Sequence, residues 1–297
     1  MGGMAQCDEC GEYSDHDGFR HLDTCSQLKT KSANIKIICA DALTYDISNL
    51  DVSCMITDPP YRDHVHKNAT SNSPGRGVRH NYLGFSSLTN ELRDRIAYFA
   101  SNVKTWSIVY SDVESLGDWK SCMETAGATY VRPLAWIRWS SPQLSGDRPP
   151  TGFELVTCYW GKQRGRKSWN GPGNLTHLSH KCLRGEGKHK TEKPLDQILD
   201  LVEFFSNPGV LVFDPCAGAG TTALACKLLG RDCISLEIDP EWADKANKRI
   251  STNLSDRDCE RYERWLQSKA QRDQDMLRMK EINQKMRDKW IVKENSQ

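Results

Sequence analysis

Short apolar runs of strand-forming residues alternate along the chain with stretches in which apolar residues recur at helical spacing. Strands are expected at 35–40, 54–57, 106–110, 129–139, 153–160, 210–213 and 232–236, and helices at 88–104, 113–125, 194–205 and after the glycine turn near 220. Such alternation is typical of a doubly wound α/β sheet. From 251 to 297, charged residues with apolar residues one or two turns apart predict one or two amphipathic helices that pack on the main domain or a partner.

Three polar segments interrupt this pattern. The segment 62–81 lacks apolar periodicity and is rich in Arg and His, which indicates a loop that orders against a substrate. The segment 140–152 is rich in Pro, Ser and Gly and is expected to be a loop. Between 162 and 193, nine Lys/Arg face two acids on a Gly-rich stretch that contains Trp169. A solvated surface is one interpretation, but beside a cleft this composition favours contact with a phosphate backbone.

Composition limits the class of protein. The chain has 297 residues, and its 40 Lys+Arg nearly balance 39 Asp+Glu, so any nucleic-acid surface must be local. No apolar run approaches the ~20 residues of a membrane helix, and the amino-terminal residues are too polar for a signal peptide. Most of the 12 cysteines stand singly in apolar segments, as reduced thiols do. We therefore expect a protein of the cytoplasm, of a bacterial or phage-type host.

The amino-terminal cysteines are different because they are clustered. Cys7-x2-Cys10 is followed after ten residues by His21-x3-Cys25, and this spacing can close a tetrahedron on zinc. The segment has few apolar residues, so metal binding would have to replace a core. The alternative is a disordered tail with incidental thiols. We predict a structural zinc site formed by Cys7, Cys10, His21 and Cys25.

The strand at 54–57 stops abruptly at Asp58-Pro59-Pro60-Tyr61. Proline has no backbone N–H, so the strand ends there, and Asp58 and Tyr61 come to the carboxyl edge where open α/β sheets bind ligands. A rigid turn is one interpretation. The string also suits methylation of an exocyclic amine, because the carboxylate and the Pro59 carbonyl can accept the two amine hydrogens and stabilise the developing charge. Tyr61 offers a face for a flipped base.

A second strand-to-helix turn contains Gly218-x-Gly220-x-x-Ala223. This pattern predicts an adenosine-containing cofactor, either a dinucleotide or S-adenosylmethionine, with Glu237 on ribose hydroxyls in both cases. The acid before the turn, Asp214, would repel a pyrophosphate but could receive the amino-acid end of S-adenosylmethionine. No Lys follows the last glycine, which excludes a Walker loop.

Together these motifs make the chain resemble the permuted, or beta, group of DNA amino-methyltransferases, in which the catalytic motif precedes the cofactor motif. The resemblance runs from about 35 to about 250. It is carried by Asp58-Pro59-Pro60-Tyr61, His189-x3-Lys193-Pro194, Asp214-Pro215-Cys216-x-Gly218-x-Gly220-Thr221-Thr222 and Glu237-Ile238-Asp239. With the doubly wound pattern, it implies a mostly parallel Rossmann-like sheet of about seven strands, with the strands ending at Asp58 and Asp214 as neighbours.

The resemblance also implies the site residues. The cofactor, S-adenosyl-L-methionine, would be held at its methionine end by Lys193 and the residues from 214 to 222, at its ribose by Glu237 and at its adenine by Asp41. The expected cofactor-binding set is Asp41, Lys193, Asp214, Pro215, Cys216, Ala217, Gly218, Gly220, Thr221, Thr222, Glu237 and Asp239. The family usually has Phe where Cys216 stands, so an apolar cofactor contact is weakened or supplied from elsewhere.

Three segments follow from these assignments: a zinc-finger segment at 1–31, a methyltransferase domain at 32–250 with a basic recognition loop at about 140–192, and a charged helical tail at 251–297. The implied activity is methylation of adenine N6 in double-stranded DNA, since Asp at the first motif position usually goes with adenine. Cytosine N4, an RNA substrate, a non-catalytic zinc-containing DNA-binding protein and a dinucleotide oxidoreductase are the alternatives. DNA contacts are predicted for Arg62, Arg76, Arg79, Arg164, Arg166, Lys167 and Trp169, and self-association for the tail helices.

Overall fold

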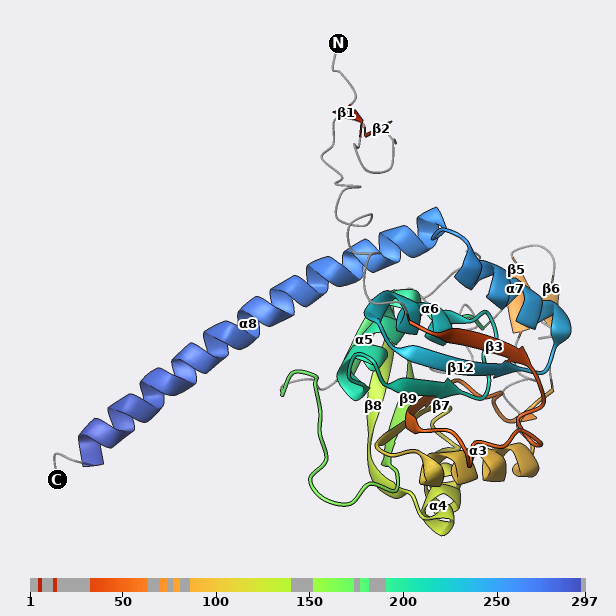
Figure 1. Cartoon of the computed structure of the whole chain (residues 1–297), viewed down its shortest axis with the longest axis horizontal. Helices are drawn as coiled ribbons and strands as arrows, with labels where there is room; N and C mark the ends of the chain where they lie inside the picture. The colour runs from red at the N-terminus through yellow and green to blue at the C-terminus, as the bar shows by residue number, and fades with distance from the viewer. Residues whose placement is uncertain are drawn as a thin grey trace.

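The computed structural model describes residues 5–6, 13–14, 33–63, 70–73, 77–80, 86–139, 152–173, 177–181 and 191–294. Its centre is one sheet of eight strands with helices on both faces (Figure 1). From edge to edge the strands are β10 (His177–Lys181), β8 (Thr129–Trp139), β9 (Phe153–Trp160), β7 (Trp106–Ser111), β4 (Val52–Thr57), β11 (Leu211–Asp214), β12 (Asp232–Glu237) and β3 (Ile35–Cys39). Only the two pairs that involve β9 are antiparallel. The predicted mostly parallel sheet is confirmed, with eight strands where about seven were expected.

The helices divide between the two faces of the sheet. One face is covered by α3 (Asn90–Asn102) and α4 (Leu116–Ala126), and the other by α5 (Leu195–Phe205), α6 (Thr221–Leu229) and α7 (Pro240–Ser251) (Figure 1). Beneath α3, the rings of Phe99 and Phe213 meet edge to face with centroids 5.1 Å apart. Beneath α5, Trp106 packs in the same way on Trp160 and Phe205. Each face therefore has its own aromatic core, and the sheet between them is a rigid support.

The centre of the sheet is a topological switch point. β4 and β11 are parallel neighbours, but the chain continues from β4 through α3 to β7 on one side and from β11 through α6 to β12 on the other. A crevice forms at the carboxyl ends of strands that part in this way, and ligands bind there. The predicted adjacency of the strands ending at Asp58 and Asp214 is confirmed.

Two predictions about irregular segments need correction. The segment 62–81 contains two short antiparallel strands, β5 (Thr70–Ser73) and β6 (Gly77–His80), that its polar sequence did not indicate. The Gly-rich stretch 162–193 contains β10, which lies parallel to β8 at the edge of the main sheet. Edge strands need only one partner, so β10 forms with a single fully apolar side chain, Leu178. Of the predicted loop 140–152, only Gly152 lies within the described residues.

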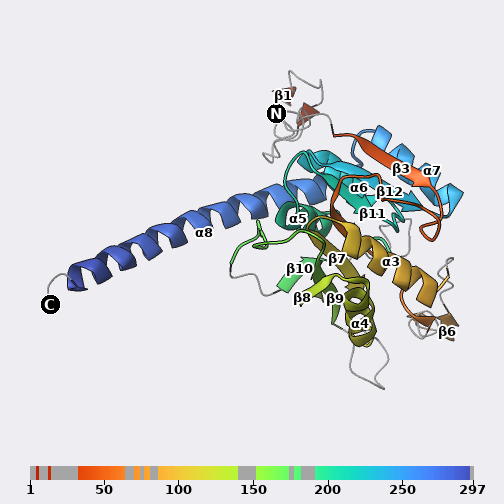
Figure 2. The same cartoon turned by 60° about the horizontal axis from the view of Figure 1, so that its bottom comes forward.

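The tail is a single helix. α8 (Asp256–Glu294) has 39 residues, packs on α5 near its start and then runs away from the domain (Figure 1). A view turned by 60° shows the same separation (Figure 2). None of the described helices combines the length and the apolar character needed to cross a membrane.

The amino-terminal segment is described only at β1 (Ala5–Gln6) and β2 (Tyr13–Ser14), which pair antiparallel. The four zinc ligands predicted from the sequence, Cys7, Cys10, His21 and Cys25, lie outside the described residues. The described residues contain no cluster of three or more metal-ligand side chains. The zinc site therefore stays a prediction.

Candidate active site

The turn after β4 places Asp58, Pro59, Pro60 and Tyr61 at the carboxyl edge of the sheet, next to the end of β11. The strand before it is core: Cys54, Met55 and Ile56 have no exposed surface. Because that strand is fixed on both sides by β7 and β11, the turn has little freedom, and the prolines restrict it further. The Asp58 side chain is therefore presented from a rigid element.

Lys193 reaches Asp58 from the other side of the crevice. Its Nζ lies 2.7 Å from Oδ2 of Asp58, and its side chain is only 10% exposed. The ammonium also lies near three aromatic rings, 5.3 Å from the centroid of Tyr61, 4.8 Å from Tyr110 and 5.9 Å from Trp136. Aromatic faces stabilise a desolvated cation. Lys193 precedes Pro194, the N-cap of α5, so the start of that helix sets its position.

Glu154 completes a buried group of charges around this pair. It lies at the start of β9 and accepts a hydrogen bond of 2.6 Å from the Tyr61 hydroxyl and one of 2.7 Å from Arg138. Lys193 Nζ is 3.4 Å from Oε2 of Glu154, the oxygen that also accepts from Tyr61. Two carboxylates and two cations thus neutralise one another in a partly dry site, which offsets the cost of their desolvation. Sequence reasoning missed Glu154 and Arg138; the available signal was an acid at the start of an otherwise apolar strand.

The charges shift each other's ionisation. Burial raises the pKa of Asp58 to about 6, although Lys193 partly opposes the rise. Burial alone would raise the pKa of Glu154 too, but Lys193 and Arg138 outweigh it and hold that pKa below its ordinary value. Burial would lower the pKa of Lys193, yet the two carboxylates outweigh burial and raise it. Near pH 7 the ammonium and both carboxylates are therefore charged, with Asp58 the first to protonate as the pH falls.

Several polar atoms of this cluster have no partner. Within the described part of the chain, Oδ1 of Asp58 is buried without a hydrogen bond, as are the Tyr110 hydroxyl and the Trp136 indole nitrogen. A buried polar atom without a partner costs free energy, so such atoms commonly mark places where a ligand or water supplies the missing bond. Asp58 is thus anchored through one carboxylate oxygen and keeps the other available to accept.

The glycine turn between β11 and α6 lies beside this cluster. Gly220 has φ +74°, and a Cβ there would lie 3.0 Å from Cβ of Ala246, so both the backbone and the space require glycine. The Gly218 N–H donates to Oε2 of Glu237 at 2.7 Å, and the Cys216 N–H donates to Asp214 at 3.1 Å. Two amides that a pyrophosphate would need are thus occupied by carboxylates.

The pKa values of those two carboxyl groups are shifted as well. Burial raises the pKa of Asp214 to about 6, against the lowering effect of the Cys216 amide. Burial also raises the pKa of Glu237, partly offset by the amides of Asp239 and Gly218. Glu237 suits ribose hydroxyls in either class of ligand, whereas Asp214 beside the turn repels phosphates and suits a positive charge. This geometry argues against a dinucleotide.

The remaining predicted cofactor residues are distributed around the turn. The Ala40 N–H donates to the Glu237 carbonyl at 3.0 Å, which sets Asp41 next to the end of β12. Asp239 caps α7 through bonds of 2.8 and 3.1 Å to the amides of Glu241 and Trp242, a structural role the sequence did not assign. Burial raises the pKa of the Cys216 thiol, so the thiol stays neutral.

Known proteins share this arrangement. The profile of the N6_N4_Mtase family, described as DNA methylase, matches residues 139–248. The type II methyltransferase M.HpaI of Haemophilus parainfluenzae is 26% identical over 243 residues, which cover 74% of this chain and 75% of that protein. The crystal structure of an M1.HpyAVI–SAM complex superposes with a TM-score of 0.56 at 25% identity, covering 72% of this chain and 99% of that one. Residues 139–248 thus form a domain of the N6_N4_Mtase family, and the relatives and solved structures support an N6/N4 amino-methyltransferase.

Among these similar proteins the fold alone does not separate the two target bases, adenine and cytosine. The cytosine-N4-specific PvuII DNA methyltransferase superposes with a TM-score of 0.53 at 15% identity, over 80% of this chain and 94% of that one. The family profile spans Glu154, Lys193 and the glycine turn, whereas Asp58 and Tyr61 precede it. The catalytic motif thus comes before the cofactor motif, as the resemblance to the permuted group implies.

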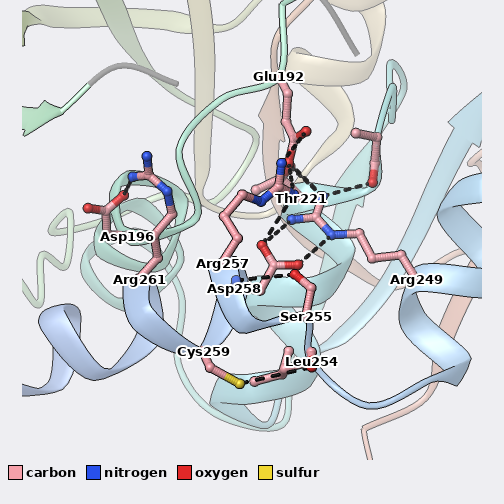
Figure 3. A network of polar contacts seen from close by, with 11 residues as sticks. Glu192, Asp196, Thr221, Arg249, Leu254, Ser255, Arg257, Asp258, Cys259 and Arg261 are labelled. Carbon is pink, nitrogen blue, oxygen red and sulfur yellow. Dashed lines mark hydrogen bonds and ion pairs between the residues drawn. The ribbon is translucent and has the colours of Figure 1, made fainter. Parts of the chain in front are cut away.

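A second buried network connects the two halves of the candidate site (Figure 3). Arg249 donates to the Ala219 carbonyl at 3.0 Å and to Thr221 at 3.2 Å, both in the glycine turn. It also pairs with Glu192, at 3.0 Å, and with Asp258, at 2.7 Å. Glu192 immediately precedes Lys193 and is 4% exposed. One guanidinium therefore links the glycine turn, the segment that carries Lys193 and the base of α8.

One predicted DNA-binding stretch lies at the edge of the sheet opposite Asp58. β9 runs antiparallel to β7, so Trp160 pairs with Trp106 at the amino edge of the parallel strands, opposite Asp58. The amides of 161–163 bond to carbonyls of 103–105 at the same edge, and Trp169 packs on Phe204 and Phe205 at the far end of α5. The residues concerned, Arg164, Arg166, Lys167 and Trp169, therefore do not lie beside the catalytic turn.

The other three predicted DNA contacts lie nearer in the chain to the catalytic turn. Arg62 follows Tyr61 directly, but its guanidinium is paired with Asp118 of α4. Arg79 belongs to β6, of which only the backbone is described, and Arg76 lies outside the described residues. Contact of these residues with DNA stays a prediction.

Proposed function

We infer that this chain transfers a methyl group from S-adenosyl-L-methionine to the exocyclic N6 of adenine in DNA. The observation that carries this proposal is the asymmetry of Asp58. One of its carboxylate oxygens is held by Lys193 at 2.7 Å, and the other is buried without a partner among the described residues. This is an oriented acceptor with room for one more hydrogen bond.

An acceptor of that kind suits an aromatic amine. The amine lone pair is delocalised into the base, so the nitrogen is a poor nucleophile. Oδ1 of Asp58 accepts one amine hydrogen and the Pro59 carbonyl the other, which favours tetrahedral nitrogen and stabilises the positive charge as it develops. Tyr61 supplies the face against which a base taken out of the duplex stacks. Since the pKa of Asp58 is about 6, the carboxylate is mostly ionised at neutral pH.

The residues around the glycine turn fit the methyl donor. Asp214 suits the amino group of its methionine end, Glu237 the ribose hydroxyls and Asp41 the adenine, with Cys216 as an apolar contact. The donor supplies an electrophilic methyl on a sulfonium, whose positive charge is compatible with two flanking acids. Lys193 takes a place different from the one the resemblance implied, since its ammonium bonds to Asp58. We assign it to holding the catalytic carboxylate.

Adenine is proposed over cytosine because Asp stands at the first position of the catalytic motif, which in the resembled family usually goes with adenine. The structural zinc at Cys7, Cys10, His21 and Cys25 is part of the same proposal, on ligand spacing alone. A zinc held by four protein ligands would have no open position and no part in the methyl transfer.

The test is product analysis. Unmodified DNA is incubated with S-adenosylmethionine and the protein, digested to nucleosides and analysed by mass spectrometry, with Asp58→Ala as the matched control. N6-methyladenine from the wild type alone supports the proposal. N4-methylcytosine would support an amino-methyltransferase but would refute adenine as the target base. No methylated nucleoside from DNA, together with calorimetric binding of NAD in place of S-adenosylmethionine, would refute the reaction.

A further inference from the structure

The second half of α8 carries an apolar surface outside the domain. In its first half, Trp265 is buried against α5 and donates to Asp200 at 2.7 Å, and Arg272 bonds to the same carboxylate at 2.9 Å. Beyond Arg272 the helix continues clear of the domain (Figures 1 and 2). Large apolar side chains are exposed there: Met276 by 36%, Met279 by 54%, Ile282 by 40% and Met286 by 57%. Apolar patches of this kind are unusual on a soluble surface and mark interaction sites.

The three methionines continue a pattern that begins at the domain, and Ile282 lies on the flank of that pattern. Steps of four and three alternate without interruption through the positions 265, 269, 272, 276, 279, 283, 286 and 290. A period of 3.5 residues is the repeat with which one helix faces another along its length. In the first half this seam faces α5, because Trp265, Lys269 and Arg272 all contact it. In the second half the same seam runs beyond α5.

We propose that the seam from Met276 to Trp290 pairs with the same seam of a second copy of this chain, with the two α8 helices antiparallel. Direction follows from the first half of the helix. A parallel pair would bring the two positions 265–272 face to face, where each helix already holds its own α5. In the antiparallel pair only the free halves overlap, and the two methyltransferase domains lie at opposite ends.

Polar residues at the seam agree with a second copy as the partner. Asn283 occupies a seam position, and a single buried Asn commonly fixes the register and number of helices in such a pair. In an antiparallel pair centred near Asn283, the exposed Asp275 on one flank comes level with position 289 of the second copy, a lysine in the sequence, and this pairing occurs twice by symmetry. The other flank has Lys280 and Arg287, so the apolar seam must supply most of the affinity.

The test is the mass of the full-length chain in solution, measured by sedimentation and light scattering over a range of concentrations. The wild type should be a dimer, and Met279→Glu with Met286→Glu should be a monomer with unchanged circular dichroism. Leu277→Glu is the control: Leu277 is 61% exposed on the same helix but off the seam, and its variant should stay dimeric.

Small-angle scattering tests the direction. The 39 residues of α8 span roughly 58 Å, so the antiparallel dimer should give two well-separated domain masses. A wild type that is monomeric at every concentration would overturn the proposal, as would a dimer that the double variant leaves intact or one in which the two domains lie together. If the wild type is a monomer and the double variant is less stable, the seam packs on a segment of the same chain, and this result would also overturn the proposal.

Discussion

Lys193 Nζ and Asp58 Oδ2 lie 2.7 Å apart although 135 positions separate the two residues in the chain. Lys193 enters from the start of α5, and Asp58 ends β4. The pairing does two things for the carboxylate. It fixes the orientation by binding one oxygen, and it lowers the pKa that burial raises, so that Asp58 is ionised near neutral pH. The lysine therefore acts on the reaction through Asp58.

Replacing this lysine should expose both effects. For Lys193→Met we expect methyl transfer to slow by on the order of 10²-fold, since a catalytic group displaced by about 1 Å loses that much. The acidic limb of the pH–rate profile should move to higher pH, because the ammonium no longer favours the carboxylate. Single-turnover rates across pH measure this, with Lys193→Arg as the conservative control that restores part of both. A pH–rate profile that does not move would show that the lysine does not control the ionisation of Asp58.

Activity and stability should respond oppositely to pH between 5 and 7. The pKa of Asp58 is about 6 in the folded protein, above the ordinary value of 3.8. The folded state therefore binds this proton more tightly than the unfolded chain does. The stability that Asp58 contributes is present at low pH and is lost as the pH rises through 6, whereas the methyl-transfer rate should rise over that interval. Asp58→Asn isolates the effect. It should melt above the wild type at pH 8 and together with it below pH 3.8, where the carboxyl is protonated in both the folded and the unfolded state. An equal difference in melting temperature at both pH values would contradict the assigned pKa.

How much of the site the sequence could predict depends on which contacts follow from local sequence patterns. Asp58 and Asp214 end two buried strands with recognisable motifs, so their meeting at the carboxyl edge could be predicted. Glu154 reaches the same site only because β9 lies antiparallel between β7 and β8. No local pattern encodes strand direction. For the same reason the sequence could not show that the basic stretch after Trp160 begins at the amino edge, although the strand before it was predicted correctly.

Strand direction also divides the basic region of 162–193 into two parts. Arg164, Arg166 and Lys167 follow the end of β9 at the amino edge, and a six-residue strand such as β4 separates the edges by about 20 Å. By contrast, β10 ends at Lys181 on the carboxyl edge, and Lys193 lies beside Asp58 at that edge. DNA bound at Asp58 should therefore be neutralised by Arg184, Lys188 and Lys190.

The measurement is the slope of log affinity against log salt for two triple variants. Replacing Arg184, Lys188 and Lys190 with Ala should reduce the slope by about 0.9 for each phosphate that is no longer neutralised. Replacing Arg164, Arg166 and Lys167 with Ala removes the same charge and is the matched control; its slope should equal that of the wild type. A reduced slope for the Arg164, Arg166 and Lys167 variant alone would instead support the DNA contacts predicted from the sequence.

The zinc prediction is tested by metal content. Atomic emission on the purified chain should find one zinc per molecule, and Cys10→Ser and Cys25→Ser should each lose it. Because the ion would be structural and the segment short of apolar residues, its removal should leave methyl transfer on saturating short DNA largely intact. Zinc near zero in a wild type prepared without chelators would refute the site, and zinc retained by both variants would assign it to other residues.

The central claim is that the free oxygen of Asp58 acts on the amine in the transition state and takes no part in holding the methyl donor. The most direct measurement compares Asp58→Ala with the wild type in single-turnover methyl transfer to DNA and, in parallel, in calorimetric affinity for S-adenosylmethionine. We expect the rate to fall by on the order of 10² to 10³ or more, as for other preorganised groups, with the affinity nearly unchanged. A variant that keeps near-normal turnover, or one whose rate falls only as far as its affinity for the donor, would contradict the account.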